Sequence, residues 1–205
     1  MVAPSVPHAD PRLDGLPLPP QPADRTPRIA PGGRRELGLP GWAFARIAGR
    51  ALGTDAPAIF RTLGRHRSLF RGWLWFAGRL MPGGLLARRE TELVILRVAH
   101  LRGSRYEFEH HVRLGRRAGI DAEGVRRVVA GPDAPGWSPR ERALLTAADR
   151  LVADRDLDDD AWRALREVLD DREAIELCML VGHYDMLATV LGTLRVQTDV
   201  PRARG

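Results

Sequence analysis

One segment of the chain concentrates side chains that can share or transfer protons. Residues 89–120 read RETELVILRVAHLRGSRYEFEHHVRLGRRAGI, with carboxylate, imidazole and hydroxyl groups beside apolar runs such as residues 93–96. Carboxylate and imidazole groups in a partly dry pocket are the usual equipment of general acid–base catalysis. The candidate catalytic residues are Glu92, Ser104, Tyr106, Glu107, His110 and His111.

Helical spacing predicts how these groups meet. On a helix that begins at Ser104, positions 104, 107 and 111 share one face, and positions 106 and 110 share an adjacent face. Gly103 breaks the preceding helical pattern, which contains Glu92. An antiparallel turn at Gly103 would bring Glu92 against the face that carries Glu107 and His111. Burial could then hold one carboxyl group protonated while the other orients the histidine.

Structural roles compete with these assignments. Ser104-x-x-Glu107 follows a helix-ending glycine and is also a capping box, which would make both residues helix caps. Tyr106 could be a core aromatic with a satisfied hydroxyl, and either histidine a hydrogen-bonded core residue. Spacing alone leaves the catalytic and structural interpretations open.

A metal site is the weaker alternative. Glu107-x-x-His110 has the spacing found in di-iron carboxylate bundles, which need a second such motif and two further carboxylates. The best second group lies around Glu176, His183 and Asp185, but no other Glu-x-x-His occurs in the sequence. We therefore predict no metal site.

The elements that must position these groups are helices. Apolar residues recur with helical spacing from Leu39 onward, and no useful alternating strand pattern occurs, so the sequence predicts an all-α fold. A Pro-rich segment, residues 1–35, predicts a disordered or extended tail able to drape over a neighbouring subunit, and residues 36–205 a single helical domain. Helices are predicted at 41–52, 56–63, 68–81, 86–102, 104–118, 122–130, 138–154, 158–169 and 171–194.

Composition limits the function classes. The 205 residues have a net charge of +6, but all 32 basic residues are arginine, so lysine-based Schiff-base chemistry is excluded. Arginines are interspersed with acidic residues, which argues against nucleic-acid binding. The single cysteine, Cys178, is predicted to be a buried core thiol. Neither a secretory signal nor a membrane span is indicated, so we predict no membrane association and a cytoplasmic location.

The same segment resembles a known family. Glu92, the run ILRVAHL and the block GSRYEFEHH at residues 103–111, ending at Ala118-Gly119, are similar to the carboxymuconolactone decarboxylase and alkyl hydroperoxidase D-like family. The resemblance extends over roughly residues 59–199. It implies a helical bundle of the alkyl hydroperoxidase D-like type that assembles into trimers or hexamers.

Position by position, the resemblance implies an incomplete redox site. Glu92 matches a relay glutamate, His111 the family histidine, and Tyr106 the position of a further relay histidine. Ser104 and Glu107 stand where peroxidase members have their two cysteines. Because neither residue can form a sulfenic acid or a disulfide, thiol peroxidase chemistry is excluded for this cysteine-less subtype.

The decarboxylase branch of the family is then the better guide. It implies a cofactor-independent acid–base enzyme, a lyase or an isomerase or cyclase, that acts on a small lactone or enolisable organic acid. Arg97 or Arg105 is predicted to bind a substrate carboxylate. The alternative is a non-catalytic member that binds small molecules or serves as a scaffold.

Overall fold

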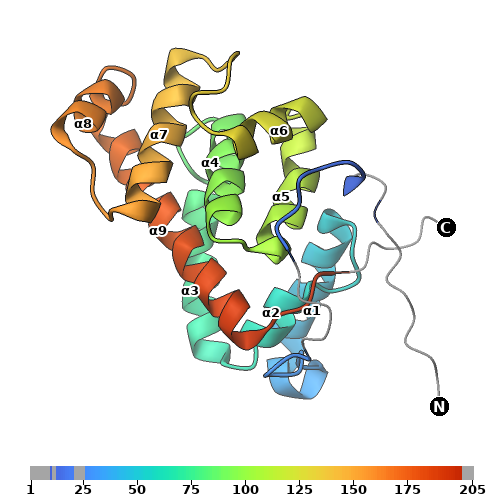
Figure 1. Cartoon of the computed structure of the whole chain (residues 1–205). Helices are drawn as coiled ribbons and strands as arrows, with labels where there is room; N and C mark the ends of the chain where they lie inside the picture. The colour runs from blue at the N-terminus through green and yellow to red at the C-terminus, as the bar shows by residue number, and fades with distance from the viewer. Residues whose placement is uncertain (1–9, 11–12, 21–25, 200–205) are drawn as a thin grey trace.

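The computed structural model describes residue 10, residues 13–20 and residues 26–199, and within these residues all regular structure is helical. The predicted all-α fold is therefore confirmed. The described part contains nine helices, shown in Figure 1. They are α1 Arg34–Leu52, α2 Ala58–Leu63, α3 Arg67–Leu80, α4 Arg88–Leu101, α5 Arg105–Arg117, α6 Ala122–Ala130, α7 Pro139–Ala153, α8 Asp159–Arg166 and α9 Asp171–Leu194.

Side-chain caps set several helix starts where the sequence placed them. Asp121 accepts a hydrogen bond from the backbone N–H of Gly124 at the start of α6. At the start of α7, Ser138 and Glu141 form the predicted reciprocal capping box, with Pro139 in the first turn. The first helix begins earlier than predicted, because a short helical turn precedes a kink at Gly38, whose φ is 71°. That positive φ is a conformation that glycine adopts readily.

Helix α4 is the centre of the fold, and it packs against α5, α7 and α9. Figure 1 shows α4 between α7 and α9 on one side and α5 and α6 on the other. Residues 93–96 are fully buried because the two faces of this helix belong to different core clusters. Val94 and Ile95 pack in the cluster shared with α7 and α9, and Leu93 and Leu96 in the cluster shared with α5 and α6.

The described part of the Pro-rich segment lies against the helical body of its own chain. Leu13 and Leu16 are buried in the second core cluster. Asp10 is buried and forms an ion pair with Arg113 of α5 at 2.9 Å. The prediction of a disordered tail otherwise falls on residues 1–9, 11–12 and 21–25, which lie outside the described residues.

The last helix is apolar and long. By length and composition alone, α9 is long and apolar enough to cross a membrane. This is weak evidence for a membrane span, because half of the apolar stretch is buried within the domain. It packs against α4 and α7 as a core helix of this fold. The prediction that Cys178 is a buried thiol is wrong, because Cys178 lies exposed on the outer face of α9, beside the exposed Ile175 and Met179.

Candidate functional site

The turn between α4 and α5 joins the two halves of the predicted site. Gly103 has a φ of 62°, and the backbone N–H of Ser104 donates to the carbonyl of Ala99 at 2.8 Å. The chain thereby reverses, and α5 packs along α4. Glu92 and His111, 19 residues apart, meet with 2.7 Å between Glu92 Oε2 and His111 Nδ1.

Glu92 is fully buried and holds two partners. Its Oε1 atom lies 2.5 Å from a guanidinium nitrogen of Arg88, one helical turn earlier in α4. Its Oε2 atom contacts the imidazole of His111, which is itself 6% exposed. Arg88 balances the buried carboxylate, and Glu92 fixes the orientation of the imidazole. Because Nδ1 faces Glu92, Nε2 is the nitrogen left for a bound molecule.

Glu107 is buried without a hydrogen-bonding partner. The residue is only 3% exposed. Neither carboxyl oxygen accepts a hydrogen bond from a residue that the structure describes. Burial raises the pKa of Glu107 to about 8. The side chain of Ser104 lies near enough to lower this pKa in part, although its hydroxyl does not meet the carboxyl group with hydrogen-bond geometry, and the negative charge of Asp185 raises it further. Glu107 is therefore mainly protonated at neutral pH.

The capping alternative for these residues is wrong. Ser104 occupies the N-cap position of α5, but its side chain makes no capping hydrogen bond, and Glu107 does not reach back to it as a capping box requires. The buried carboxyl group of Glu107 therefore has no role as a helix cap.

The adjacent face of α5 is bound to the C-terminal segment. Asp199 Oδ2 lies 2.7 Å from His110 Nε2 and accepts a hydrogen bond from the Tyr106 hydroxyl at 2.6 Å. Asp199 Oδ1 accepts from the backbone N–H of Ala58, the first residue of α2, and Tyr106 also accepts from the N–H of Ile59. Burial lowers the pKa of His110, although Asp199 acts in the opposite direction.

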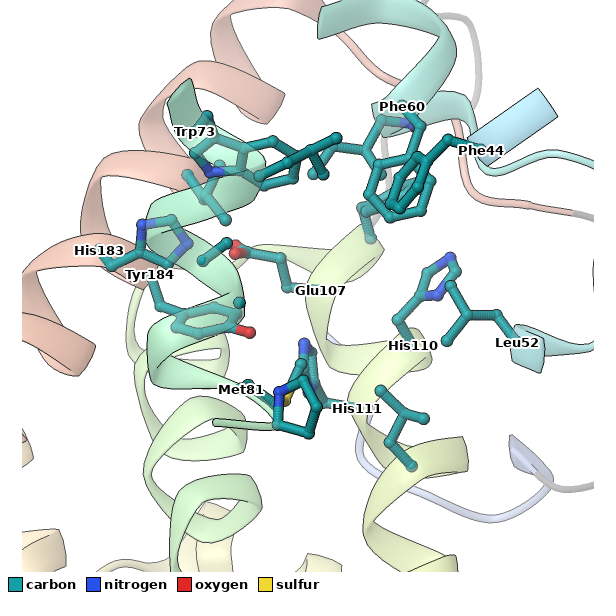
Figure 2. A pocket seen from close by; sticks show the side chains of 18 residues that line it. Phe44, Leu52, Phe60, Trp73, Met81, Glu107, His110, His111, His183 and Tyr184 are labelled. Atoms are coloured by element: carbon teal, nitrogen blue, oxygen red, sulfur yellow. The ribbon is translucent and has the colours of Figure 1, made fainter. Parts of the chain in front are cut away.

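A cavity of about 320 Å³ lies against this part of α5. Side chains from α1, α2, α3, α5 and α9 line it, together with Met81 and Pro82. Figure 2 shows Phe44, Phe60 and Trp73 along one side, with Glu107, His111 and Tyr184 pointing in from the other. Of the six predicted catalytic residues, four line the cavity: Tyr106, Glu107, His110 and His111. Glu92 lies behind His111, and Ser104 lines a smaller neighbouring pocket.

Two residues of α9 belong to the site although they were not predicted to be catalytic. The ring of Tyr184 contacts the ring of His111 edge-on at 5.2 Å and that of His183 at the same separation. Burial lowers the pKa of His183 to about 4, so this imidazole is neutral at pH 7. Burial also raises the pKa of Tyr184. The sequence did contain a feature that could have identified these two residues, since a histidine and a tyrosine interrupt the apolar run of a core helix.

The predicted substrate-binding arginines lie elsewhere. Arg97 pairs with Asp149 through two nitrogens, at 2.6 and 2.8 Å, and donates to the carbonyls of Val128 and Val129. Arg105 pairs with Glu109 and donates to the carbonyl of Pro19 at 3.2 Å. Neither arginine is among the residues that line the cavity.

The residues of the weaker metal interpretation are also separated. Among the described residues, no group of three or more His, Cys, Asp and Glu side chains has an arrangement that could hold a metal ion. Glu176 accepts hydrogen bonds from the backbone of Leu85 and Leu86, and Asp185 pairs with Arg102. His110 meets Asp199 rather than completing a site with Glu107.

A comparison with protein families matches the segment that carries most of these residues. Residues 67–150, which run from α3 into α7 and include Glu92, Glu107 and His111, match the model of the Carboxymuconolactone decarboxylase family. The resemblance to this family is confirmed. A search of curated proteins found no match.

Solved structures share the fold. The AhpD core of an uncharacterized peroxidase-related protein from Ralstonia eutropha JMP134 is 19% identical, with a TM-score of 0.76 over 86% of this chain and 94% of that chain. An uncharacterized peroxidase-related protein from Silicibacter sp. TM1040 is 17% identical, with a TM-score of 0.73 over 87% and 95%. The debrominase Bmp8 is 16% identical, with a TM-score of 0.72 over 83% and 91%.

Proposed function

We propose that this protein is a cofactor-independent acid–base enzyme of the carboxymuconolactone decarboxylase type, acting on a small lactone or enolisable molecule. The observation that carries the proposal is Glu107, a buried carboxyl group that faces the cavity without a hydrogen-bonding partner among the described residues. A buried polar group without a partner destabilises a fold, and such groups are concentrated at functional sites. The oriented imidazole of His111 lines the same cavity.

The two groups have complementary roles in the proposed reaction. His111 Nε2 removes a proton from the carbon next to a carbonyl group, and the electron pair of that C–H bond moves to the carbonyl oxygen. Glu107 donates a hydrogen bond, or its proton, to this oxygen and stabilises the enolate. The imidazolium of His111, stabilised by the buried Glu92, then returns the proton to the same or another carbon.

This enolate step is common to the reaction types that the sequence suggests. In a lyase, loss of carbon dioxide would generate the enolate instead of proton removal, and protonated His111 would protonate the carbon. In an isomerase, the proton returns to a different carbon. Thiol peroxidase chemistry has no support in the cavity, since Cys178 is not one of the lining residues.

Exchange of substrate hydrogen with solvent tests the function. The probes are benzofuranone, an aromatic lactone, and phenylpyruvate, an enolisable acid, in deuterium oxide with exchange followed by NMR. We expect the protein to accelerate exchange of at least one probe, and Glu107→Gln or His111→Asn to reduce that acceleration roughly 100-fold or more.

Matched controls separate catalysis from folding. Glu123→Gln and His100→Asn are the same substitutions outside the cavity, and both variants should keep full exchange activity. Unchanged exchange in both Glu107→Gln and His111→Asn would contradict the proposal. A wild-type protein that binds small molecules but accelerates neither probe would favour the alternative, a non-catalytic binding protein.

We further propose that the chain forms a homo-oligomer. An apolar strip on α9 supports this, with Ile175 65%, Met179 47% and Met186 47% exposed. Light scattering of Ile175→Glu should show smaller particles than the wild type. A wild-type protein that is monomeric at micromolar concentration would contradict the proposal.

A further inference from the structure

The cavity that contains Glu107 has an aromatic wall. Phe44 and Phe60 contact each other edge-on at 5.2 Å, and Phe60 also contacts Trp73 with 6.0 Å between the ring centroids. Trp73 in turn stacks on His183 with an interplanar angle of 20°. This row of rings is visible in Figure 2. Such walls favour flat rings, which gain stacking and edge contacts beyond the burial of area.

Three polar groups of the cavity, Glu107, His183 and Tyr184, are neutral at pH 7. Burial raises the pKa of Glu107 to about 8 and lowers the pKa of His183 to about 4. Burial also raises the pKa of the Tyr184 hydroxyl. These groups can donate or accept hydrogen bonds, but none of them supplies a positive charge to a bound molecule.

Permanently charged cations are also missing from the described residues that line the cavity. The described residues that line the cavity include no arginine, and the chain has no lysine. The guanidinium group of Arg88, which lies behind His111, is held by Glu92. A carboxylate in this cavity would be desolvated without a counter-ion, and the negative charge of Asp185 already acts on Glu107.

We propose that the cavity selects an uncharged molecule with an aromatic ring and one hydrogen-bonding group, and that it rejects the corresponding carboxylate. This inference rests on the proposed function and specifies its substrate class. The ring packs against Phe60 and Trp73, and its polar group lies between Glu107 and His111. Among the reaction types above, an uncharged substrate favours isomerisation or cyclisation over decarboxylation.

Calorimetry with matched ligands tests this selection without requiring turnover. Benzamide and benzoate have nearly the same shape and differ in charge, and cyclohexanecarboxamide differs from benzamide in its saturated ring. At pH 7 we expect benzamide to bind roughly tenfold or more tightly than benzoate. We also expect it to bind more tightly than cyclohexanecarboxamide.

Paired variants locate the binding site. Trp73 lines the cavity, whereas Trp75 on the same helix is 68% exposed. Quenching of tryptophan fluorescence by benzamide should be lost in Trp73→Phe and kept in Trp75→Phe. Leu52→Arg adds a cation to the lining and should increase benzoate binding, whereas Leu69→Arg, on the exposed surface outside the cavity, should not.

The outcomes are distinguishable from a failure of the proposed function. Three results would overturn the inference. They are benzoate binding as tight as that of benzamide, tighter binding of cyclohexanecarboxamide than of benzamide, and no benzamide binding up to its solubility. Exchange of phenylpyruvate together with preferential benzoate binding would leave the acid–base function standing. Benzamide selectivity without any exchange activity would leave the inference standing and remove the function.

Discussion

Two neighbouring histidines of α5 have different surroundings. His110 contacts Asp199, whose two oxygens are both used by other groups, the Tyr106 hydroxyl and the backbone N–H of Ala58. His111 contacts Glu92, and the face that it shares with Glu107 borders the cavity. On one side every polar group named here has a partner, and on the other Glu107 has no hydrogen-bonding partner among the described residues.

Within one helical turn of α5, one set of polar groups stabilises the fold and the other is the candidate for catalysis. The Asp199 side joins the C-terminal segment to α2 and α5, and satisfied buried groups of this kind stabilise the fold. The Glu107 side has an energetic cost, because a carboxyl group is buried without compensation. A group maintained at such a cost is the better candidate for catalysis, whereas His110 and Tyr106 have the better structural explanation.

The largest expected effect on stability comes from replacing Glu107, whose buried carboxyl group destabilises the fold when it ionises. The folded-state pKa of about 8 lies above the ordinary glutamate value of 4.5, so wild-type stability falls as pH rises through this window. Glu107→Gln cannot ionise and lacks this loss. Relative to pH 5, the variant should therefore gain roughly 3 to 5 kcal/mol over wild type at pH 9, measured by urea unfolding.

The control is Glu123→Gln, an exposed site where the same substitution should leave the pH profile of stability unchanged. Parallel profiles for wild type and Glu107→Gln between pH 5 and pH 9 would show that Glu107 ionises normally. In that case the two sides of α5 would not differ as described.

A smaller effect on stability is expected from the side of α5 that contacts Asp199, where the polar groups have hydrogen-bonding partners. Asp199→Ala removes the partner of His110, Tyr106 and Ala58, and should lower the free energy of unfolding by about 3 kcal/mol. Tyr106→Phe removes one hydroxyl from the same group and should cost about 1 kcal/mol. Neither loss should carry the pH dependence of Glu107→Gln. Wild-type stability in Asp199→Ala, measured by urea unfolding, would show that this group does not stabilise the fold.

The sequence predicted the helical fold and the Glu92–His111 part of the site, because both depend on patterns that are short-range in the chain. Helical periodicity and local signals such as Ser138-x-x-Glu141 are short-range, so they predicted the helices and several of their starts. The meeting of Glu92 and His111 followed from one turn at Gly103. The partner of His110 could not be predicted, because Asp199 is 89 residues away and no local pattern links them.

The same limit explains the arginines and the cavity. Arg97 and Arg105 were plausible carboxylate ligands by position, but the sequence could not show that Asp149 and Glu109 would hold them. Likewise, the positions of His183 and Tyr184 depend on how α9 packs against α4 and α5. Cys178 lies in an apolar run, yet that stretch of α9 exposes one apolar face, so hydrophobicity alone predicted the wrong burial.

Direct titration of the Glu107 carboxyl group tests the central claim. The infrared carbonyl band of the protonated acid, taken as wild type minus Glu107→Gln, would be followed from about pH 4 to about pH 10. Our account predicts a protonated carboxyl group at pH 7 and a midpoint near the pKa of about 8 that burial produces. A midpoint near the ordinary glutamate value of 4.5 would contradict it, because Glu107 would then be ionised at neutral pH and unable to act as the acid.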